Sequence, residues 1–187
     1  DYAEFYANVD HIAGRLARSI QPVGRDGGEW ELTARLAGDG VIRWDGIELP
    51  QGYRLTLHSD GARYDMRRRG EAALAGGAHA LRVTLDWVAP HQTRLLSNYP
   101  NPFNPETWIP FELSAGSSVT VRVYDIGGKV MRRIELGYRD AGYYTGRADA
   151  AYWDGRNEVG EHVASGIYFY ELRAGAQRSL RRMVVHK

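Results

Sequence analysis

Residues 98–110, NYPNPFNPETWIP, contain four of the chain's seven prolines. Proline lacks a backbone N–H and holds φ at about −65°, so a segment this rich in proline cannot form a helix or a central strand. We therefore expect an ordered, extended segment at a domain boundary. Tyr99 and Phe103 are large apolar side chains within it, and we expect them to hold the segment against the domain that follows.

The residues after this segment show the pattern of short antiparallel strands. Apolar and polar residues alternate, and turn residues separate the runs at hairpin spacing. Glycine and asparagine in DIGG at 125–128, DGRN at 154–157 and SG at 165–166 permit the positive φ angles of tight turns. Six or seven strands over residues 98–187 predict an immunoglobulin-like β-sandwich. The expected strands are TWIPFEL, SVTVRVYDI, KVMRRIEL, AAYWD, GIYFYELRA and SLRRMVVHK.

Residues 29–97 show the same alternation, broken by the clusters AGDG, LPQG, SDG and AGG. They predict a second antiparallel sandwich, which would serve as a spacer or accessory domain. The fold class is therefore all-β, with two immunoglobulin-like β-sandwich domains in tandem. Trp30, Trp44 and Trp87 each lie in register with other apolar positions, so we expect core anchors. The alternative is an exposed aromatic platform on which sugars stack.

Residues 1–28 form a separate amino-terminal segment. Apolar residues recur at i, i+3 and i+4 between Tyr2 and Ile20, which predicts an amphipathic helix. Gly14 weakens that prediction. The alternative is an edge strand over residues 2–6 that pairs with a neighbouring domain.

The composition excludes several functional classes. The net charge of +1 over 187 residues is too balanced for non-specific nucleic-acid binding, which needs clustered positive charge. The absence of cysteine excludes disulfides and thiolate metal sites. No apolar run reaches the roughly 20 residues of a membrane-spanning helix, and no secretory signal opens the chain. Because the chain starts at Asp1 without methionine, we expect part of a longer polypeptide with upstream domains.

Residues 98–187 resemble two related families. The segments NYPNPFNPET, VYDIGGKV, YWDGRNEVGEHVASGIYFYELRAG and RRMVVHK are similar to those of the type A carboxyl-terminal sorting domain of type IX secretion substrates. The stretch from WDGRN to SGIYFY also resembles the immunoglobulin-like domain of the flagellar hook-capping protein. Trp108, Pro110 and the long stretch at 137–155 depart from the common pattern and indicate a lineage-specific subgroup.

The resemblance implies a non-catalytic carboxyl-terminal region of a larger secreted or cell-surface bacterial protein. The last domain would carry a sorting signal, in residues 165–187, to outer-membrane secretion machinery or cell-surface components, and would attach the protein to the cell surface. The motif residues expected to carry this function, or to shape the domain for it, are Asn98, Tyr99, Pro100, Asn101, Pro102, Phe103, Asn104, Pro105, Trp153, Asp154, Gly155, Gly166, Tyr168, Arg182 and Lys187.

No residue pattern predicts an enzyme or a cofactor site. The histidines lack the HxH or HxxxH spacing of a shared metal, and the serines lack the GxSxG elbow of a hydrolase. Asp154, Asn157 and Glu158 are a weak candidate for Ca²⁺, which takes oxygen ligands in loops. Because Asp and Asn in turns usually bond their own backbone, turn capping is the stronger interpretation.

Two other functions stay open as alternatives. One is an extracellular module that binds carbohydrate or protein, and it predicts a row of exposed tryptophans. The other is self-assembly by strand addition, in which the apolar amino-terminal segment adds to a free sheet edge.

Overall fold

The computed structural model describes residues 2–5, 19–22, 27–45 and 47–186. All regular structure in these residues is β-strand, which confirms the all-β prediction. The part of the chain that the structure describes contains no helix able to cross a membrane. The chain divides into two compact units, Asp1–Val88 and Ala89–Lys187, and each has its own hydrophobic core.

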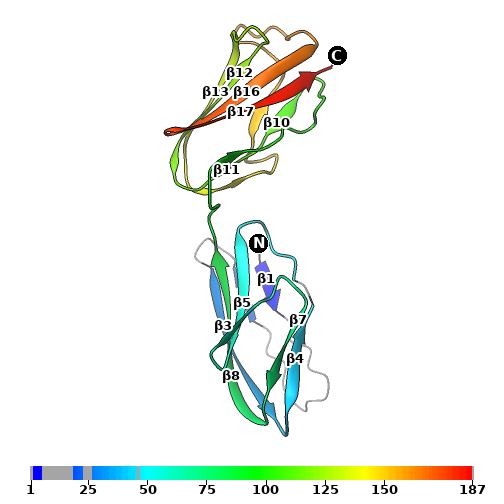
Figure 1. Cartoon of the computed structure of the whole chain (residues 1–187), viewed down its shortest axis with the longest axis vertical. Coiled ribbons are helices and arrows are strands. Elements are labelled where there is room, and N and C mark those ends of the chain that lie inside the picture. The colour runs from blue at the N-terminus through cyan, green and yellow to red at the C-terminus, as the bar shows by residue number, and fades with distance from the viewer. Residues whose placement is uncertain (1, 6–18, 23–26, 46, 187) are drawn as a thin grey trace. The chain divides into compact units, whose positions relative to one another are not determined.

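The first unit is built from antiparallel pairs (Figure 1). Its largest sheet has the order β3-β8-β5-β6, and β4 pairs with β7. Trp30 and Trp44 are buried in its core, which confirms them as core anchors, whereas Trp87 is only partly buried. The strands are β1 Tyr2–Phe5, β2 Ser19–Pro22, β3 Gly28–Leu36, β4 Gly40–Trp44, β5 Tyr53–Ser59, β6 Ala62–Asp65, β7 Gly70–Leu74 and β8 Gly77–Trp87.

The prediction of an amino-terminal helix is wrong where the structure describes that segment. β1 and β2 are strands that pair antiparallel, from Tyr2 opposite Pro22 to Phe5 opposite Ser19. The aromatic residues of the first strand favour extended structure, and pairing gives both strands a ladder of backbone hydrogen bonds. Residues 6–18 of the expected helix lie outside the described residues. The alternative of an edge strand fits β1, but its partner is β2 rather than a neighbouring domain.

The second unit is a sandwich of short antiparallel strands. One sheet has the order β13-β12-β16-β17, and Figure 1 shows β16 and β17 side by side along it. The facing strands form the sheets β14-β11-β9 and β10-β15. The strands are β9 Arg94–Leu95, β10 Thr107–Ile109, β11 Phe111–Leu113, β12 Ser117–Tyr124, β13 Val130–Arg139, β14 Gly142–Tyr144, β15 Ala151–Trp153, β16 Gly166–Ala174 and β17 Gln177–Val185.

Alternate residues of these strands fill the core, because successive side chains of a strand point to opposite faces. The largest fully buried side chains include Trp153, Tyr170, Phe103 and Phe111. We expected the second domain to begin at Asn98, but it begins earlier in the structure. β9 pairs with β11, and Leu95 is buried in the same core, so this strand belongs to the second sandwich.

The buried Tyr170 hydroxyl joins β16 to the start of the proline-rich segment. It accepts a hydrogen bond from the Asn98 N–H at 3.0 Å and donates one to the Leu96 carbonyl at 2.9 Å. Burial raises the pKa of Tyr170 above its ordinary value, so the hydroxyl keeps the proton that it donates. One side chain therefore satisfies two backbone groups at the domain entrance.

Gly155 is required where the loop after β15 passes the proline-rich segment. Its φ is +70°, in the left-handed region, and a Cβ built on it would lie 2.5 Å from the Pro105 carbonyl oxygen. Only glycine avoids both the backbone strain and this overlap. The close approach places the DGRN turn directly against the proline-rich segment.

Replacing Tyr170 with phenylalanine should destabilise the second unit by roughly 2–3 kcal/mol, because the Asn98 N–H and the Leu96 carbonyl both lose their partner. Tyr168→Phe is the matched control. Its hydroxyl donates only to the carbonyl of the exposed Ala164, which water can satisfy, so the expected loss is about 1 kcal/mol or less. Urea unfolding measures both. Equal losses would contradict the role given to the Tyr170 hydroxyl.

Gly155→Ala should lower the free energy of unfolding by about 2–4 kcal/mol. This is the sum of two costs, that of holding alanine at a left-handed φ and that of displacing the backbone that its Cβ overlaps. Gly160→Ala separates the two causes. Gly160 has a similar φ of +84°, yet no atom lies within 4 Å of the position that a Cβ would take, so only the conformational cost of about 1 kcal/mol remains. If both variants unfold at the same urea concentration, the overlap with Pro105 has no energetic weight.

Candidate functional site

The segment 98–105, here called the proline segment, is held in place by hydrogen bonds from its first residue. The buried Asn98 Nδ2 donates to the Pro100 carbonyl at 3.1 Å and to Thr107 Oγ1 at 3.0 Å. Thr107 Oγ1 in turn donates to the Pro100 carbonyl. Tyr99 forms an antiparallel bridge with Trp108. These bonds fix the segment against the second sandwich, but its backbone is not extended as the sequence predicts: Pro100, Asn101, Pro102, Asn104 and Pro105 lie at bends, and the peptide bonds before Pro100, Pro102 and Pro105 are cis.

The second half of the proline segment lies along the outer edge of β17. The Phe103 N–H donates to the Val184 carbonyl at 3.1 Å, and the His186 N–H donates to the Phe103 carbonyl at 3.0 Å. The Asn101 side chain adds a third bond, because its Oδ1 accepts from the Val184 N–H at 2.9 Å. The proline segment thus covers the carboxyl-terminal end of the edge of β17.

Phe103 anchors this arrangement in the core, as the sequence predicts. Its side chain is 2% exposed and packs edge-to-face on Trp153 with the ring centroids 5.5 Å apart. Trp153 Nε1 donates to the Arg156 carbonyl, which fixes the turn that follows. The motif residues Asn98, Asn101, Phe103, Trp153 and Gly155 therefore meet in one place, although they come from two distant parts of the sequence.

Other motif residues contact this cluster through their backbone or lie away from it. The Pro100 carbonyl accepts from Asn98, and the Pro105 carbonyl lies against Gly155. Pro100, Pro102, Asn104 and Pro105 are exposed parts of the proline segment. Gly166 and Arg182 are exposed on β16 and β17. Lys187 lies outside the described residues.

Tyr168 is a core residue that also reaches the turn before β16. It is 6% exposed, packs on Trp153, and donates from its hydroxyl to the Ala164 carbonyl at 3.0 Å. Burial, together with the negative charge of Asp125, raises the pKa of Tyr168. Its place in the motif is explained by packing.

The candidate Ca²⁺ ligands have other partners. Asp154 Oδ1 accepts from the Arg156 N–H at 3.1 Å, and Asn157 Oδ1 accepts from the N–H groups of Val159 and Glu161. These are the turn-capping bonds of the alternative interpretation. Across the described residues, no group of three or more Asp, Glu or His side chains is placed to hold a metal ion. Calcium binding stays a sequence-based prediction.

Glu158 has a role that sequence reasoning missed. Its Oε1 accepts from the backbone N–H of Arg133 at 2.5 Å, and Arg132 donates to the Asn157 carbonyl at 3.3 Å. The DGRN turn and its next residue thus cover part of the edge of β13, at the opposite side of the sheet from β17. No local signal identifies this contact, because the residues lie 25 positions apart.

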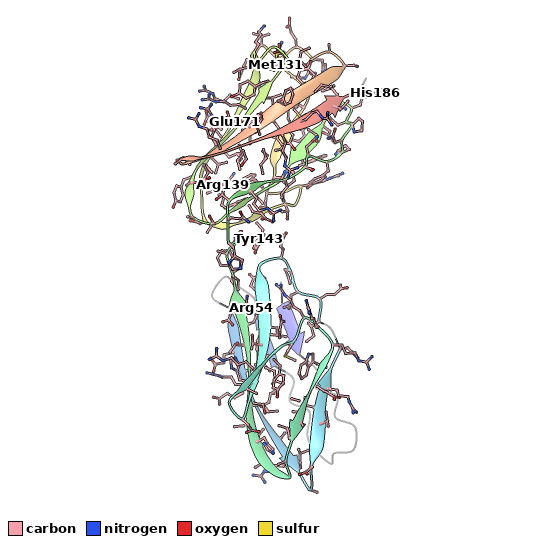
Figure 2. The ribbon with its side chains drawn as sticks, in the orientation of Figure 1. Arg54, Met131, Arg139, Tyr143, Glu171 and His186 are labelled. Atoms are coloured by element: carbon pink, nitrogen blue, oxygen red, sulfur yellow. The ribbon has the colours of Figure 1, made fainter. Side chains whose placement is uncertain are left out.

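The outer face of the four-stranded sheet carries a polar network around Glu171 (Figure 2). Glu171 Oε2 accepts from the Tyr124 hydroxyl and from Arg173 Nε, each at 2.7 Å. Burial acts to raise the pKa of Glu171, but these hydrogen bonds and the charges of Arg173 and Arg178 outweigh it, and the pKa lies below its ordinary value. Glu171 is therefore a carboxylate whose charge is stabilised by hydrogen bonds from Tyr124 and Arg173.

The facing layer carries an aromatic ladder, formed by Tyr99, Trp108 and Tyr152. Trp108 stacks on Tyr99 with centroids 6.2 Å apart and lies 5.6 Å from Tyr152. The Arg147 guanidinium lies 4.3 Å from the centroid of the Trp108 ring. A hydrogen bond from Tyr152 to Glu106 raises the pKa of Tyr152. The ladder is partly exposed, so it is an aromatic surface, but it holds one tryptophan and not a row of them.

The histidines of the first sheet that the structure describes are bonded to their neighbours. His79 Nδ1 lies 3.1 Å from Asp60 Oδ2, yet its other ring nitrogen is bonded to the Ala75 carbonyl. No nucleophile can therefore face this imidazole in the observed rotamer. His58 pairs with Thr84 in the same sheet.

Residues 106–178 match the family model of the FlgD Ig-like domain. The match covers most of the second sandwich and confirms the immunoglobulin-like part of the resemblance. No curated protein matches the chain.

Solved structures similar to the chain include two from Porphyromonas gingivalis. One is PorZ, described as an essential bacterial surface component of the type IX secretion system, at 23% identity over 49% of this chain and 11% of PorZ, with a TM-score of 0.34. The other is dimeric latent PorU, at 14% identity over 98% of this chain and 20% of PorU, with a TM-score of 0.36. A GH2 β-galacturonidase from Eisenbergiella tayi matches at 12% identity over 99% of this chain and 43% of the enzyme, with a TM-score of 0.28. The chain spans less than half the length of each of these proteins.

Proposed function

We propose that the second sandwich is a non-catalytic sorting and attachment module of a secreted or cell-surface bacterial protein. Its partners are outer-membrane secretion machinery or cell-surface components. The first unit serves as a spacer between this module and upstream domains. The proposal needs neither a cofactor nor a metal.

The bonds between the proline segment and β17 support this proposal best. Two of the stretches that carry the resemblance lie at opposite ends of the sandwich sequence, and Asn101 and Phe103 connect them through Val184 and His186. These bonds do not cover the outward-pointing side chains of β16 and β17. Ile167 and Arg182, for example, stay exposed. A sorting receptor would read this folded surface.

The aromatic ladder favours a second candidate, an extracellular carbohydrate-binding module. Tyr152 is 46% exposed, and aromatic rings with a polar rim are a suitable surface for stacking. Against this candidate, Arg147 covers a face of the Trp108 ring. Binding of a sugar would require this side chain to move.

Export of a reporter tests the sorting proposal. The whole chain is fused behind a secreted reporter in a type IX-competent host and compared with a fusion that ends at Val88, the limit of the first unit. We expect only the fusion with the second unit to reach the culture medium or the cell surface. A matched pair then locates the signal: Ile167→Glu, on β16, should reduce export severalfold, whereas Ile126→Glu, in the turn after β12, should not.

Both isoleucines are exposed, at 44% and 78%, so neither substitution buries a charge. Circular dichroism of the purified chains confirms that both variants are folded. Export of the fusion that ends at Val88, or equal export of the two Glu variants, would refute a sorting signal on the last two strands.

The carbohydrate alternative has its own measurement. Binding of cellohexaose or chitohexaose to the whole chain should be undetectable by tryptophan fluorescence if the ladder only stabilises the fold. A saturable change that Tyr152→Ala abolishes and Tyr138→Ala leaves intact would instead favour the second candidate. Tyr138 is the suitable control because it is also exposed, at 67%, but lies on β13.

A further inference from the structure

The pairing of β16 with β17 determines which backbone groups of β17 face outward. The two strands are joined by the short turn at 175–176 and stay in register from Ala174 opposite Gln177 to Gly166 opposite Val185. In an antiparallel pair, alternate residues bond the partner strand, and the residues between them direct their N–H and C=O away from it. Val184 belongs to the outward set, because its N–H and C=O bond Asn101 and Phe103.

The same alternation assigns Arg178, Leu180 and Arg182 to the outward set. β17 is the last strand in its sheet. The proline segment covers the edge only from Val184 onward, and within the described residues no backbone partner faces the three residues before it. The middle of β17 therefore has outward backbone groups without a partner strand, although the Arg181 side chain between them bonds the Leu95 carbonyl and Ser97 Oγ.

The other edge of this sheet is not comparably open. β13 has register shifts against β12 at two places, which break the regular ladder. Glu158 also occupies the Arg133 N–H. Of the two edges, β17 is the one able to accept a further strand.

The side chains of the open edge indicate the chemistry of such a strand. Leu180 is 61% exposed and lies between two arginines on the same face. Arg178 lies directly opposite Arg173, whose guanidinium is already bonded to Glu171, and Arg182 lies opposite Phe169. Among the described residues, neither Arg178 nor Arg182 has a carboxylate within ion-pair distance. Glu171, directly opposite Leu180, interacts with the charge of Arg178, but its hydrogen bonds go to Tyr124 and Arg173. Two arginines without a bonded carboxylate thus flank one exposed leucine.

A second copy of this chain would be a poor partner for the edge. Antiparallel pairing of two β17 strands about Leu180 would place Arg178 of one copy opposite Arg182 of the other. Like charges directly opposite each other destabilise a sheet. The amino-terminal strand β1, the donor expected for self-assembly, is already paired with β2.

We propose that the edge formed by Arg178, Leu180 and Arg182 binds an extended segment of another protein in which acidic, aliphatic and acidic residues occupy alternate positions. The segment adds antiparallel to β17 as an additional strand. Its backbone bonds the outward N–H and C=O groups, its two carboxylates pair with Arg178 and Arg182, and its aliphatic residue covers Leu180. This inference rests on the proposed function only in assigning that segment to a component that sorts or attaches the module.

A peptide titration of the whole chain tests the edge directly. The probes are the peptides TETLTET and TKTLTKT, with blocked ends. Two-dimensional NMR of the ¹⁵N-labelled chain follows their binding. We expect the amide signals of Arg178, Leu180 and Arg182 to shift with TETLTET more than those of Ser179 and Arg181, whose N–H groups bond β16. Binding of the acidic peptide should be about fivefold to tenfold tighter than binding of the lysine peptide, from two added charge pairs.

Variants separate the backbone contribution from the charges. Leu180→Pro removes one outward N–H without removing a bond to β16, a position where an edge strand tolerates proline, and should abolish binding. The double variant Arg178→Glu with Arg182→Glu should reverse the preference in favour of TKTLTKT. Arg139→Glu, at the exposed end of β13, is the control for net charge and should leave the preference unchanged.

The outcomes distinguish this inference from the proposed function. Equal binding of the two peptides, or retained binding by Leu180→Pro in a folded chain, overturns the edge site whatever the export assay shows. Selective binding that reverses in the double variant supports the edge site even if the whole chain is not exported, in which case only the proposed function fails. If Leu180→Pro does not fold, the double variant still tests the edge site, because its peptide preference either reverses or does not.

Discussion

The backbone hydrogen bonds of Phe103 to Val184 and His186 are the constraint on which the second sandwich depends. They join the segment that enters the domain to the strand that completes it. Trp153 packs on the Phe103 ring, and Gly155 has to be glycine because the loop after β15 passes against the same segment. Tyr170 closes the arrangement by bonding two backbone groups at the domain entrance. Asn101, Phe103, Trp153 and Gly155 therefore serve one structural purpose, which is to hold remote parts of the sequence together.

The two edge strands of the four-stranded sheet, β13 and β17, differ in how far their backbone groups are covered. On β13, bulges and the Glu158 carboxylate disrupt or occupy the ladder. On β17, the proline segment covers only one end. Natural sheets usually protect their edges with charge, bulges or covering loops. Arg178 and Arg182 protect the open stretch of β17 from pairing with strands of any sequence. The same two charges make this edge selective for acidic partner strands.

Sequence reasoning succeeds here where the signals are local. Proline density at 100–110 marks a segment without regular structure near the domain boundary, and alternation identifies the strands on either side of it. The amino-terminal helix is wrong in the residues that the structure describes there, 2–5 and 19–22, and the second sandwich begins before Asn98. Neither the pairing of β1 with β2 nor that of β9 with β11 leaves a local pattern in the sequence. The candidate site is less accessible still, since its contacts join remote residues such as Arg133 and Glu158. Arg182 is found from the motif, whereas Arg178 and Leu180 become visible only through the register of β17.

The contact between the proline segment and β17 also determines when the second unit can finish folding. Asn101 and Val184 are 83 residues apart, so their hydrogen bond closes nearly the whole domain into one loop. Contacts at such separation form late, because the chain loses the entropy of closing the loop before the contact stabilises it. Synthesis proceeds from the amino terminus, and strands β3 to β8 of the first unit are complete long before β17 emerges from the ribosome. The first unit can therefore fold during translation, while the second waits for its last strand.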